Sequence, residues 1–257
     1  MVNAIKKAEE NLANQNRLYC VGSIVHNAQE VARLTQKGVQ VIDIDKAKKL
    51  NNQLILFRAH GEPPESYDAI KQTNNTLIDA TCPVVLKIQQ RIKKAWQKAQ
   101  LYNGQIVLFG KKNHPEVIGL LGQTNFKAIL IEHENDIHKI DFHKPVELFS
   151  QTTKSLEQFN KIAELIKQKA KSELKINDTI CRQVSNRNKQ LQEFSKNFEL
   201  VYFVGDPQSS NSKVLFESCK KTNPNTLFIT SELDIDKEFV RKYNSFGICG
   251  ATSTPQW

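Results

Sequence analysis

The stretch NTLIDATCPVV, residues 75–85, runs from an apolar, strand-like segment through a cysteine and a proline into a segment with helical spacing. After the junction, apolar residues recur every three or four positions, as in Ile88 and Ile92, which is the period of an amphipathic helix. Proline is favoured at the first position of a helix, so we expect Cys82 to be the N-cap and Pro83 the first helical residue. A cysteine at this junction could be a redox thiol, a nucleophile, a metal ligand or part of the core.

The same pattern of apolar run, polar junction and helix recurs along the chain. The runs that predict strands are RLYCVGSIVHN, NQLILFRAHGE, NTLIDATCPVV, GQIVLFGKKNHPEV, PVELFSQTT, NFELVYFVGDPQSSNS, NTLFITSE and NSFGICGATSTP. Strands that alternate with helices indicate an α/β fold with mainly parallel sheets. We expect three small α/β units, residues 1–81, 82–177 and 178–257. In open parallel sheets, ligands bind at the carboxyl ends of the strands, so the junction residues are the candidates for function.

Composition and charge restrict the classes of function. Of the 257 residues, 39% are hydrophobic and 25% are charged, as in an ordinary globular protein. No apolar run reaches the roughly 18 residues of a membrane span, and the first residues lack the apolar core of a secretory signal. We therefore expect a cytoplasmic protein that does not contact membranes. The net charge of +9 comes mostly from scattered lysines without a nucleic-acid-binding motif, so we do not expect nucleic acid as a partner.

Three of the six histidines follow apolar runs and precede predicted helices: His26, His60 and His114. A single histidine of this kind is more often structural, but three at equivalent positions indicate convergence on one site. Imidazoles that can be protonated, together with helix N-termini, would suit a phosphate or diphosphate. Glu116 follows two residues after His114. It is either a proton donor near that site or an acid that complements the helix dipole.

A second candidate anion site lies in the stretch GDPQSSNS, which follows the apolar run LVYFV. Ser209, Ser210, Asn211 and Ser212 can cap a helix, which we expect to begin near Lys213, or donate hydrogen bonds to phosphate oxygens. Capping alone needs one such residue, so a run of them favours an anion site. The same theme recurs more weakly at two other junctions, which contain Thr152 and Ser253.

The five cysteines are widely spaced and include no C-x-x-C pair, so neither a zinc ribbon nor a thioredoxin motif is present. Cys82 and Cys181 stand at strand-to-helix junctions, where a helix N-terminus stabilises the thiolate form that binds metals. Cys20 and Cys249 lie within predicted strands and Cys219 within a predicted helix, so we interpret these three as core. Two thiolates suggest a shared cluster, yet two ligands are too few for a typical iron–sulfur site.

Together the junctions resemble the LytB/IspH family of 4-hydroxy-3-methylbut-2-enyl diphosphate reductases. The matching motifs, in the family's order, are IVHN, RAHGE, DATCP, NHPEVIGLLGQT, SQTT, ICRQVSNR, SSNS and GATSTP. The resemblance implies three α/β units about a pseudo-threefold axis, with a central [4Fe–4S] cluster. It also implies the activity, which is the reductive dehydroxylation of 4-hydroxy-3-methylbut-2-enyl diphosphate to isopentenyl and dimethylallyl diphosphate. This reaction is the last step of the methylerythritol phosphate pathway. The expected electron donor is a ferredoxin or flavodoxin.

The resemblance further implies cluster ligands, contacts to the substrate and a source of protons. The implied cluster ligands are Cys82 and Cys181. The implied substrate-binding residues are His26, His60, His114, Thr152, Ser209, Ser210, Asn211 and Ser253. The implied catalytic residues are Glu116, which supplies protons, with His114 and Thr152 in support.

The beginning and the end of the sequence depart from the family pattern. The family places its first cluster cysteine in a Gly-Phe-Cys motif just before the helix that is expected here to begin at about Val2, and it continues past Trp257 into a further helix. We therefore expect the third unit to be incomplete, without the family's N-terminal strand and C-terminal helix. The alternative to a reductase is then a truncated, cluster-deficient relative that binds a diphosphate without redox chemistry.

Overall fold

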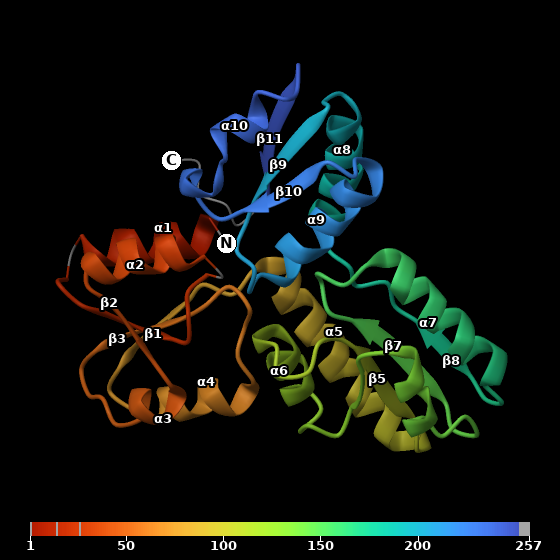
Figure 1. The fold of residues 1–257 in the computed structure, drawn as a ribbon. Helices are drawn as coiled ribbons and strands as arrows, with labels where there is room; N and C mark the ends of the chain where they lie inside the picture. The colour runs from red at the N-terminus through yellow and green to blue at the C-terminus, as the bar shows by residue number, and fades with distance from the viewer. Residues whose placement is uncertain (1, 14, 26, 252–257) are drawn as a thin grey trace. The chain divides into compact units, whose positions relative to one another are not determined.

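The structure, a computed structural model, describes residues 2–13, 15–25 and 27–251 (Figure 1). The chain divides into two compact units, Met1–Ile24 with Arg33–Ile180, and Val25–Ala32 with Cys181–Trp257. Three sheets are described, and every strand pairing in them is parallel.

The first sheet of the larger unit has four strands in the order β2-β1-β3-β4. The elements along this part of the chain are α1 (Val2–Leu12), β1 (Leu18–Val21), α2 (Ala28–Gln36), β2 (Val39–Ile42), α3 (Ile44–Ala47), β3 (Leu54–Phe57), α4 (Pro64–Lys71) and β4 (Thr76–Asp79). Ile55 and Phe57 of β3 pack with Ile70 of α4, and all three side chains are fully buried. This core places the loop after β3 and the junction after β4 at the carboxyl edge of the sheet.

The second sheet of the larger unit repeats this order, as β6-β5-β7-β8. Its elements are α5 (Pro83–Ala99), η1 (Gln100–Tyr102), β5 (Gln105–Phe109), α6 (Pro115–Gly122), β6 (Ile129–Ile131), η2 (Glu134–Lys139), β7 (Val146–Ser150), α7 (Leu156–Lys169) and β8 (Leu174–Ile176). Side chains of β5 alternate between two cores, with Ile106 and Leu108 in the core of α5 and α6 and Val107 and Phe109 in the core of α7. Burial on both faces explains why this strand is a continuous apolar run.

The smaller unit contains a three-stranded sheet in the order β10-β9-β11. Its elements are α8 (Arg182–Lys196), β9 (Leu200–Val204), α9 (Ser210–Thr222), β10 (Thr226–Ile229), η3 (Glu232–Asp234), α10 (Lys237–Val240) and β11 (Phe246–Gly250). Phe203 of β9 packs with Leu191 of α8 and Leu215 of α9, whereas Tyr202 belongs to the core on the opposite face.

The α/β class with parallel sheets agrees with the prediction, but three strands were missed. β2, β6 and β8 are not among the apolar runs, and each forms an edge of its sheet. An edge strand is partly exposed, so its sequence carries less apolar character than that of a central strand. Each of the three sheets lies within one of the three predicted intervals, 1–81, 82–177 and 178–257. The chain nevertheless divides into only two compact units, so the three intervals remain a proposal for the domain boundaries.

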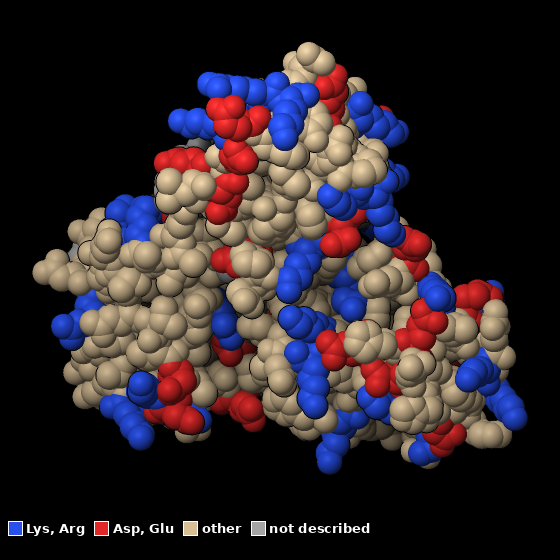
Figure 2. Space-filling view, viewed as in Figure 1, with Lys and Arg blue, Asp and Glu red and all other residues tan. Residues whose placement is uncertain are grey.

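Charges of both signs share the surface. Figure 2 shows Lys and Arg over much of the visible face, with Asp and Glu among them. Some of these side chains form exposed pairs, such as Lys161 with Glu134 at 2.7 Å, and such pairs contribute only about 0–1 kcal/mol each. Across the described residues, no helix combines the length and apolar character needed to cross a membrane.

Candidate active site

Cys82 lies at the junction between β4 and α5, as predicted. It is the N-cap of α5, Pro83 is the first helical residue, and the thiol makes no capping hydrogen bond. The side chain is half-buried, and the cysteine is not in a disulfide. Because α5 has 17 residues, its N-terminus places the full positive end of a helix dipole next to Cys82.

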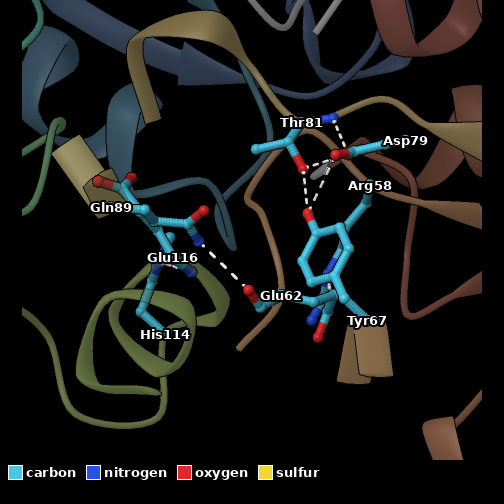
Figure 3. A network of polar contacts seen from close by, with 8 residues as sticks. All are labelled: Arg58, Glu62, Tyr67, Asp79, Thr81, Gln89, His114 and Glu116. Carbon is cyan, nitrogen blue, oxygen red and sulfur yellow. Dashed lines mark hydrogen bonds and ion pairs between the residues drawn. The ribbon is translucent and has the colours of Figure 1, made fainter. Parts of the chain in front are cut away.

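Hydrogen bonds before Cys82 hold the turn that presents the thiol. Asp79 Oδ1 accepts hydrogen bonds from the Thr81 backbone N–H at 2.9 Å and the Thr81 hydroxyl at 2.5 Å. The Tyr67 hydroxyl donates to Asp79 Oδ2 at 3.2 Å and lies 3.1 Å from the Thr81 hydroxyl (Figure 3). The Cys82 N–H donates to the carbonyl oxygen of Ala59 at 3.0 Å. The backbone at Cys82 is therefore fixed from both sides, and sequence reasoning did not identify Tyr67 as part of this support.

Burial separates Cys20 and Cys219 from the candidate ligands Cys82 and Cys181. Cys20 and Cys219 are 0% exposed, whereas Cys82 and Cys181 are half-buried at helix N-termini. Burial raises the pKa of Cys20 to about 12, so this thiol stays protonated and is a poor metal ligand. Cys249 is half-buried and packs against the core that contains Cys219. The interpretation of Cys20 and Cys219 as core thiols is confirmed.

Two of the predicted histidines lie together in the larger unit. His60 is in the loop that follows β3, and His114 is the N-cap of α6. Their ring centroids are 5.6 Å apart, with an interplanar angle of 84°. His114 Nδ1 accepts a hydrogen bond from the Glu116 backbone N–H at 3.2 Å. This leaves the other ring nitrogen, Nε2, as the position that can carry a proton in the neutral ring.

Glu116 and Thr152 form a buried pair beside His114. The Thr152 backbone N–H donates to Glu116 Oε1 at 2.6 Å, and the Thr152 hydroxyl donates to Oε2 at 2.7 Å. Glu116 is 2% exposed and Thr152 is 6% exposed. Burial raises the pKa of Glu116 to about 7, although both hydrogen bonds from Thr152 favour the carboxylate and act against this rise. A carboxyl group with a pKa near neutrality can exchange protons at physiological pH, which favours the proton-donor interpretation.

Gln151 precedes Thr152 at the end of β7, and the sequence pointed to it only as part of a weaker copy of the capping and anion theme. It is fully buried. Its Oε1 accepts a hydrogen bond from the Lys111 backbone N–H at 3.0 Å, and its Nε2 donates to the Thr153 hydroxyl at 2.9 Å. Gln151 therefore ties the segment that follows β5, which leads to His114, to the segment that follows β7.

In the smaller unit, the predicted anion site lies at the N-terminus of α9. Ser209 is the N-cap, and its hydroxyl accepts a hydrogen bond from the Ser212 backbone N–H at 3.3 Å. The helix begins at Ser210, so the expected start near Lys213 is wrong. Ser210 and Asn211 are therefore the first two residues of α9 and not residues that precede it.

Ser212 is the last residue of the predicted SSNS run, although the family resemblance does not name it among the substrate-binding residues. Its side chain is fully buried, and its hydroxyl lacks a hydrogen-bond partner among the described residues. A buried hydroxyl without a partner costs about 1–3 kcal/mol, which a bound anion would offset. The sequence signal was present in the SSNS run, in which Ser209, Asn211 and Ser212 are all buried.

Two predicted residues, His26 and Ser253, lie outside the described residues. The segment that follows His26 is described within the smaller unit. There the Ala28 backbone N–H donates to Asp206 Oδ2 at 3.1 Å. The first residue of α2 is therefore tied to the GDPQSSNS junction.

The fit of a metal cluster depends on the two thiols. Iron–sulfur clusters are held by cysteine thiolates, and Cys82 and Cys181 are both free N-cap cysteines of long helices with no side-chain capping bond. The described part of the chain contains no group of three or more His, Cys, Asp or Glu side chains arranged around a metal position. Each thiol thus fits the role of a single cluster ligand.

Comparison with known proteins identifies the family. The family model described as LytB protein matches residues 1–257. The chain belongs to the LytB family. A relative from Bacteroides fragilis, named 4-hydroxy-3-methylbut-2-enyl diphosphate reductase, is 49% identical over 259 residues, which cover 100% of this chain and 89% of that protein. A relative of the same name from Chloroherpeton thalassium is 42% identical, and the match covers 99% of this chain and 88% of that protein.

Solved structures support the same LytB assignment. E-1-hydroxy-2-methyl-but-2-enyl-4-diphosphate reductase from Plasmodium falciparum matches with a TM-score of 0.88 and 28% identity, over 99% of this chain and 80% of that chain. A second reductase structure, described as the terminal enzyme of the non-mevalonate pathway, matches with a TM-score of 0.74 and 33% identity, over 99% of this chain and 90% of that chain. The predicted family and the predicted fold class are both confirmed.

Proposed function

We propose that this LytB-family protein is a 4-hydroxy-3-methylbut-2-enyl diphosphate reductase. The observation that carries the proposal is the buried Glu116–Thr152 pair beside His114, whose carboxyl group has a pKa of about 7. The pair belongs to a chain that is 49% identical to a reductase of this name over its whole length.

The reaction replaces the substrate's allylic hydroxyl group by hydrogen. The C–O bond breaks, two electrons and two protons enter, a C–H bond forms, and the oxygen leaves as water. The products are isopentenyl and dimethylallyl diphosphate, which makes this the last step of the methylerythritol phosphate route. The protein residues therefore have two tasks, to hold the diphosphate and to deliver protons.

Cys82 and Cys181 are the proposed ligands of a [4Fe–4S] cluster. When bound, such a cluster supplies single electrons and a Lewis-acidic iron for the hydroxyl group. A ferredoxin or flavodoxin is the proposed source of the electrons. We place the protein in the cytoplasm, and the absence of disulfides among its five cysteines suits that reducing compartment.

Glu116 is the proposed proton donor. With a pKa of about 7 it is protonated in a substantial fraction of molecules at neutral pH. The Thr152 hydroxyl, 2.7 Å from Oε2, holds the carboxyl group in one orientation and is the proposed contact of the substrate hydroxyl. After Glu116 gives up its proton, the two Thr152 hydrogen bonds stabilise the carboxylate that remains.

The diphosphate is the proposed ligand of the histidines and of the α9 N-terminus. His26, His60 and His114 supply imidazoles that can donate to phosphate oxygens. Ser209, Ser210, Asn211 and Ser253 supply hydroxyl and amide groups, and the N–H groups at the start of α9 add a positive dipole end. The unpartnered Ser212 hydroxyl supports an anion at this position.

The test combines metal content with turnover. The protein is purified without oxygen after growth with iron and sulfide, and iron, acid-labile sulfide and the EPR spectrum are measured. Turnover of 4-hydroxy-3-methylbut-2-enyl diphosphate is then followed with a chemical reductant. We expect Glu116→Gln to retain its iron and to lose on the order of 100-fold or more in kcat, the contribution of a positioned acid.

A matched control is Glu132→Gln, which changes an acid whose carboxylate accepts a bond from the Lys112 backbone N–H at 3.3 Å. This variant should keep both iron and turnover. An iron-loaded wild-type protein that consumes no substrate would contradict the proposal. A protein that binds diphosphate but never acquires iron would instead support the cluster-deficient alternative.

A further inference from the structure

Gln89 lies where three elements of the larger unit meet. It is on α5, about two turns after Cys82, and its side chain is buried, with 5% exposed. Its Nε2 donates a hydrogen bond to the backbone carbonyl oxygen of Glu62 at 3.3 Å (Figure 3). Glu62 belongs to residues 58–63, which follow β3 and carry His60; we call this segment the His60 loop. The Gln89 amide therefore links α5 to the His60 loop.

Two glycines make room for this amide. A Cβ atom at Gly61 would lie 2.7 Å from Gln89 Nε2, and one at Gly119 would lie 2.9 Å from the same atom. The Cβ at Gly119 would also lie 3.0 Å from the Gly61 carbonyl oxygen, so α6 and the His60 loop approach each other backbone to backbone. Gly61 has a φ of 74°, in the left-handed region that glycine adopts without strain. We call the space between Gly61 and Gly119 that holds the Gln89 amide the notch. A side chain at Gly61 would be strained by its φ, whereas a methyl group at Gly119 would displace the Gln89 amide and press on the His60 loop.

The elements that meet at this notch carry the proposed site groups. His114 is the N-cap of α6 and Glu116 is in its first turn, whereas His60 is in the loop on the other side of the notch. The two imidazole rings are 5.6 Å apart. The distance of the His60 loop from α6 therefore sets how far His60 stands from His114 and Glu116.

We infer that Gln89 is a positioning residue for the reductase reaction: its amide, seated between Gly61 and Gly119, fixes His60 relative to His114. The role rests on the proposed function, because it concerns residues assigned there to substrate binding. Gln89 acts through the His60 loop and α6. A methionine at this position would keep nearly the same volume and remove the donor, which leaves the Glu62 carbonyl oxygen without this hydrogen bond.

The first test needs no catalytic activity. Side-chain signals of the six histidines are assigned by NMR in protein labelled with ¹⁵N at histidine, in the wild type and in three variants. Gln89→Met removes the amide, and Gly119→Ala places a methyl group in the notch. Gln123→Ala is the matched control, because the Gln123 amide donates to the Gly119 carbonyl oxygen at 3.2 Å on α6 itself. We expect the His60 and His114 signals to shift in the first two variants and to stay in place in the control.

The second test separates positioning from general destabilisation. With cluster-loaded enzyme, Gln89→Met and Gly119→Ala should raise KM for the substrate on the order of tenfold, while kcat changes less than about twofold. The alkaline limb of the pH profile should not move, because Thr152 and not Gln89 holds the Glu116 carboxyl group. A purely structural loss would lower the melting temperature and the active fraction without this separation of KM from kcat.

The outcomes distinguish this inference from the proposed function. Unchanged His60 and His114 signals in both variants would overturn the positioning role, and so would equal shifts in the Gln123 control. If the wild type proves inactive but the signals shift as expected, the proposed function fails while the positioning of His60 stands. If Gln89→Met does not fold, Gly119→Ala carries the test, since alanine is favoured over glycine within a helix.

Discussion

Substitution of Thr152 by valine tests the origin of the Glu116 pKa. Valine has nearly the same shape as threonine but lacks the hydroxyl group that donates to Glu116 Oε2 at 2.7 Å, and the backbone N–H that donates to Oε1 at 2.6 Å remains. A hydrogen bond to a charged group contributes about 1.5–3 kcal/mol. Since 1.36 kcal/mol corresponds to one pH unit, losing this bond to the carboxylate should raise the pKa of Glu116 by roughly one to two pH units.

The higher pKa should be visible in catalysis. If protonated Glu116 is the donor, the alkaline limb of kcat/KM, expected near pH 7 in the wild type, should move up by roughly one to two pH units in Thr152→Val. The direct measurement is the titration of the Glu116 side-chain carbon signal by ¹³C NMR. Rates alone are insufficient, because loss of the Thr152 hydroxyl also lowers kcat if that group contacts the substrate.

Thr124→Val provides the matched control for this prediction. Thr124 follows the end of α6 and is fully buried, but its hydroxyl donates to the Leu121 carbonyl oxygen at 2.8 Å and not to Glu116. The control should lose stability and leave the pKa of Glu116 unchanged. A pKa in Thr152→Val that equals or lies below the wild-type value would refute the argument that this hydroxyl stabilises the carboxylate.

Three further predictions concern stability and metal content. Burial raises the pKa of Glu116 from 4.5 to about 7, so between these pH values the folded protein keeps a proton that the unfolded chain has lost, and the free energy of unfolding falls as pH rises. Glu116→Gln should remove this fall, which is on the order of 3 kcal/mol. If urea unfolding gave the same dependence of the free energy of unfolding on pH for both proteins, the assignment would be contradicted. Cys82→Ser should lower the iron content of anaerobically purified protein, whereas Cys219→Ala should keep the iron and lose stability; equal iron in both would remove Cys82 as a ligand. Ser209→Ala should lower the free energy of unfolding by about 0.5–2 kcal/mol through loss of the α9 cap, and no change in the melting temperature would show that the cap is not significant.

Sequence reasoning located the central strands, the junctions and the edge strands β4, β10 and β11, but it missed the edge strands β2, β6 and β8. The β5 run is apolar because both of its faces are buried, and that pattern is visible in the residues themselves. β8 consists of Leu174–Ile176, of which two residues are exposed. A strand this short and this polar shows no alternation of apolar and polar residues that would predict it. Its place in the sheet comes from pairing with β7, which is a contact between distant parts of the chain.

The helix starts were predicted where local chemistry decides them. Cys82 with Pro83 and His114 with Pro115 both begin helices as expected, because a proline at the first position acts within one turn. The start of α9 was misplaced, since several neighbouring hydroxyl side chains could each serve as the cap. In the folded chain the cap is Ser209, whose hydroxyl accepts the hydrogen bond from the Ser212 backbone N–H.

The sequence by itself determined the family, the α/β class and the residue types at each junction, because apolar period and capping are properties of neighbouring residues. The roles of Glu116 and Cys20 depended on the folded chain. Glu116 meets Thr152 across 36 residues of sequence, and its raised pKa arises from burial, which no local pattern reports. Burial likewise keeps the Cys20 thiol protonated, while Cys82, also beside an apolar run, stays half-buried. In both residues the pKa is raised because burial removes the water that would stabilise the charged form, the Glu116 carboxylate or the Cys20 thiolate. Only the packed structure determines how much water reaches each group.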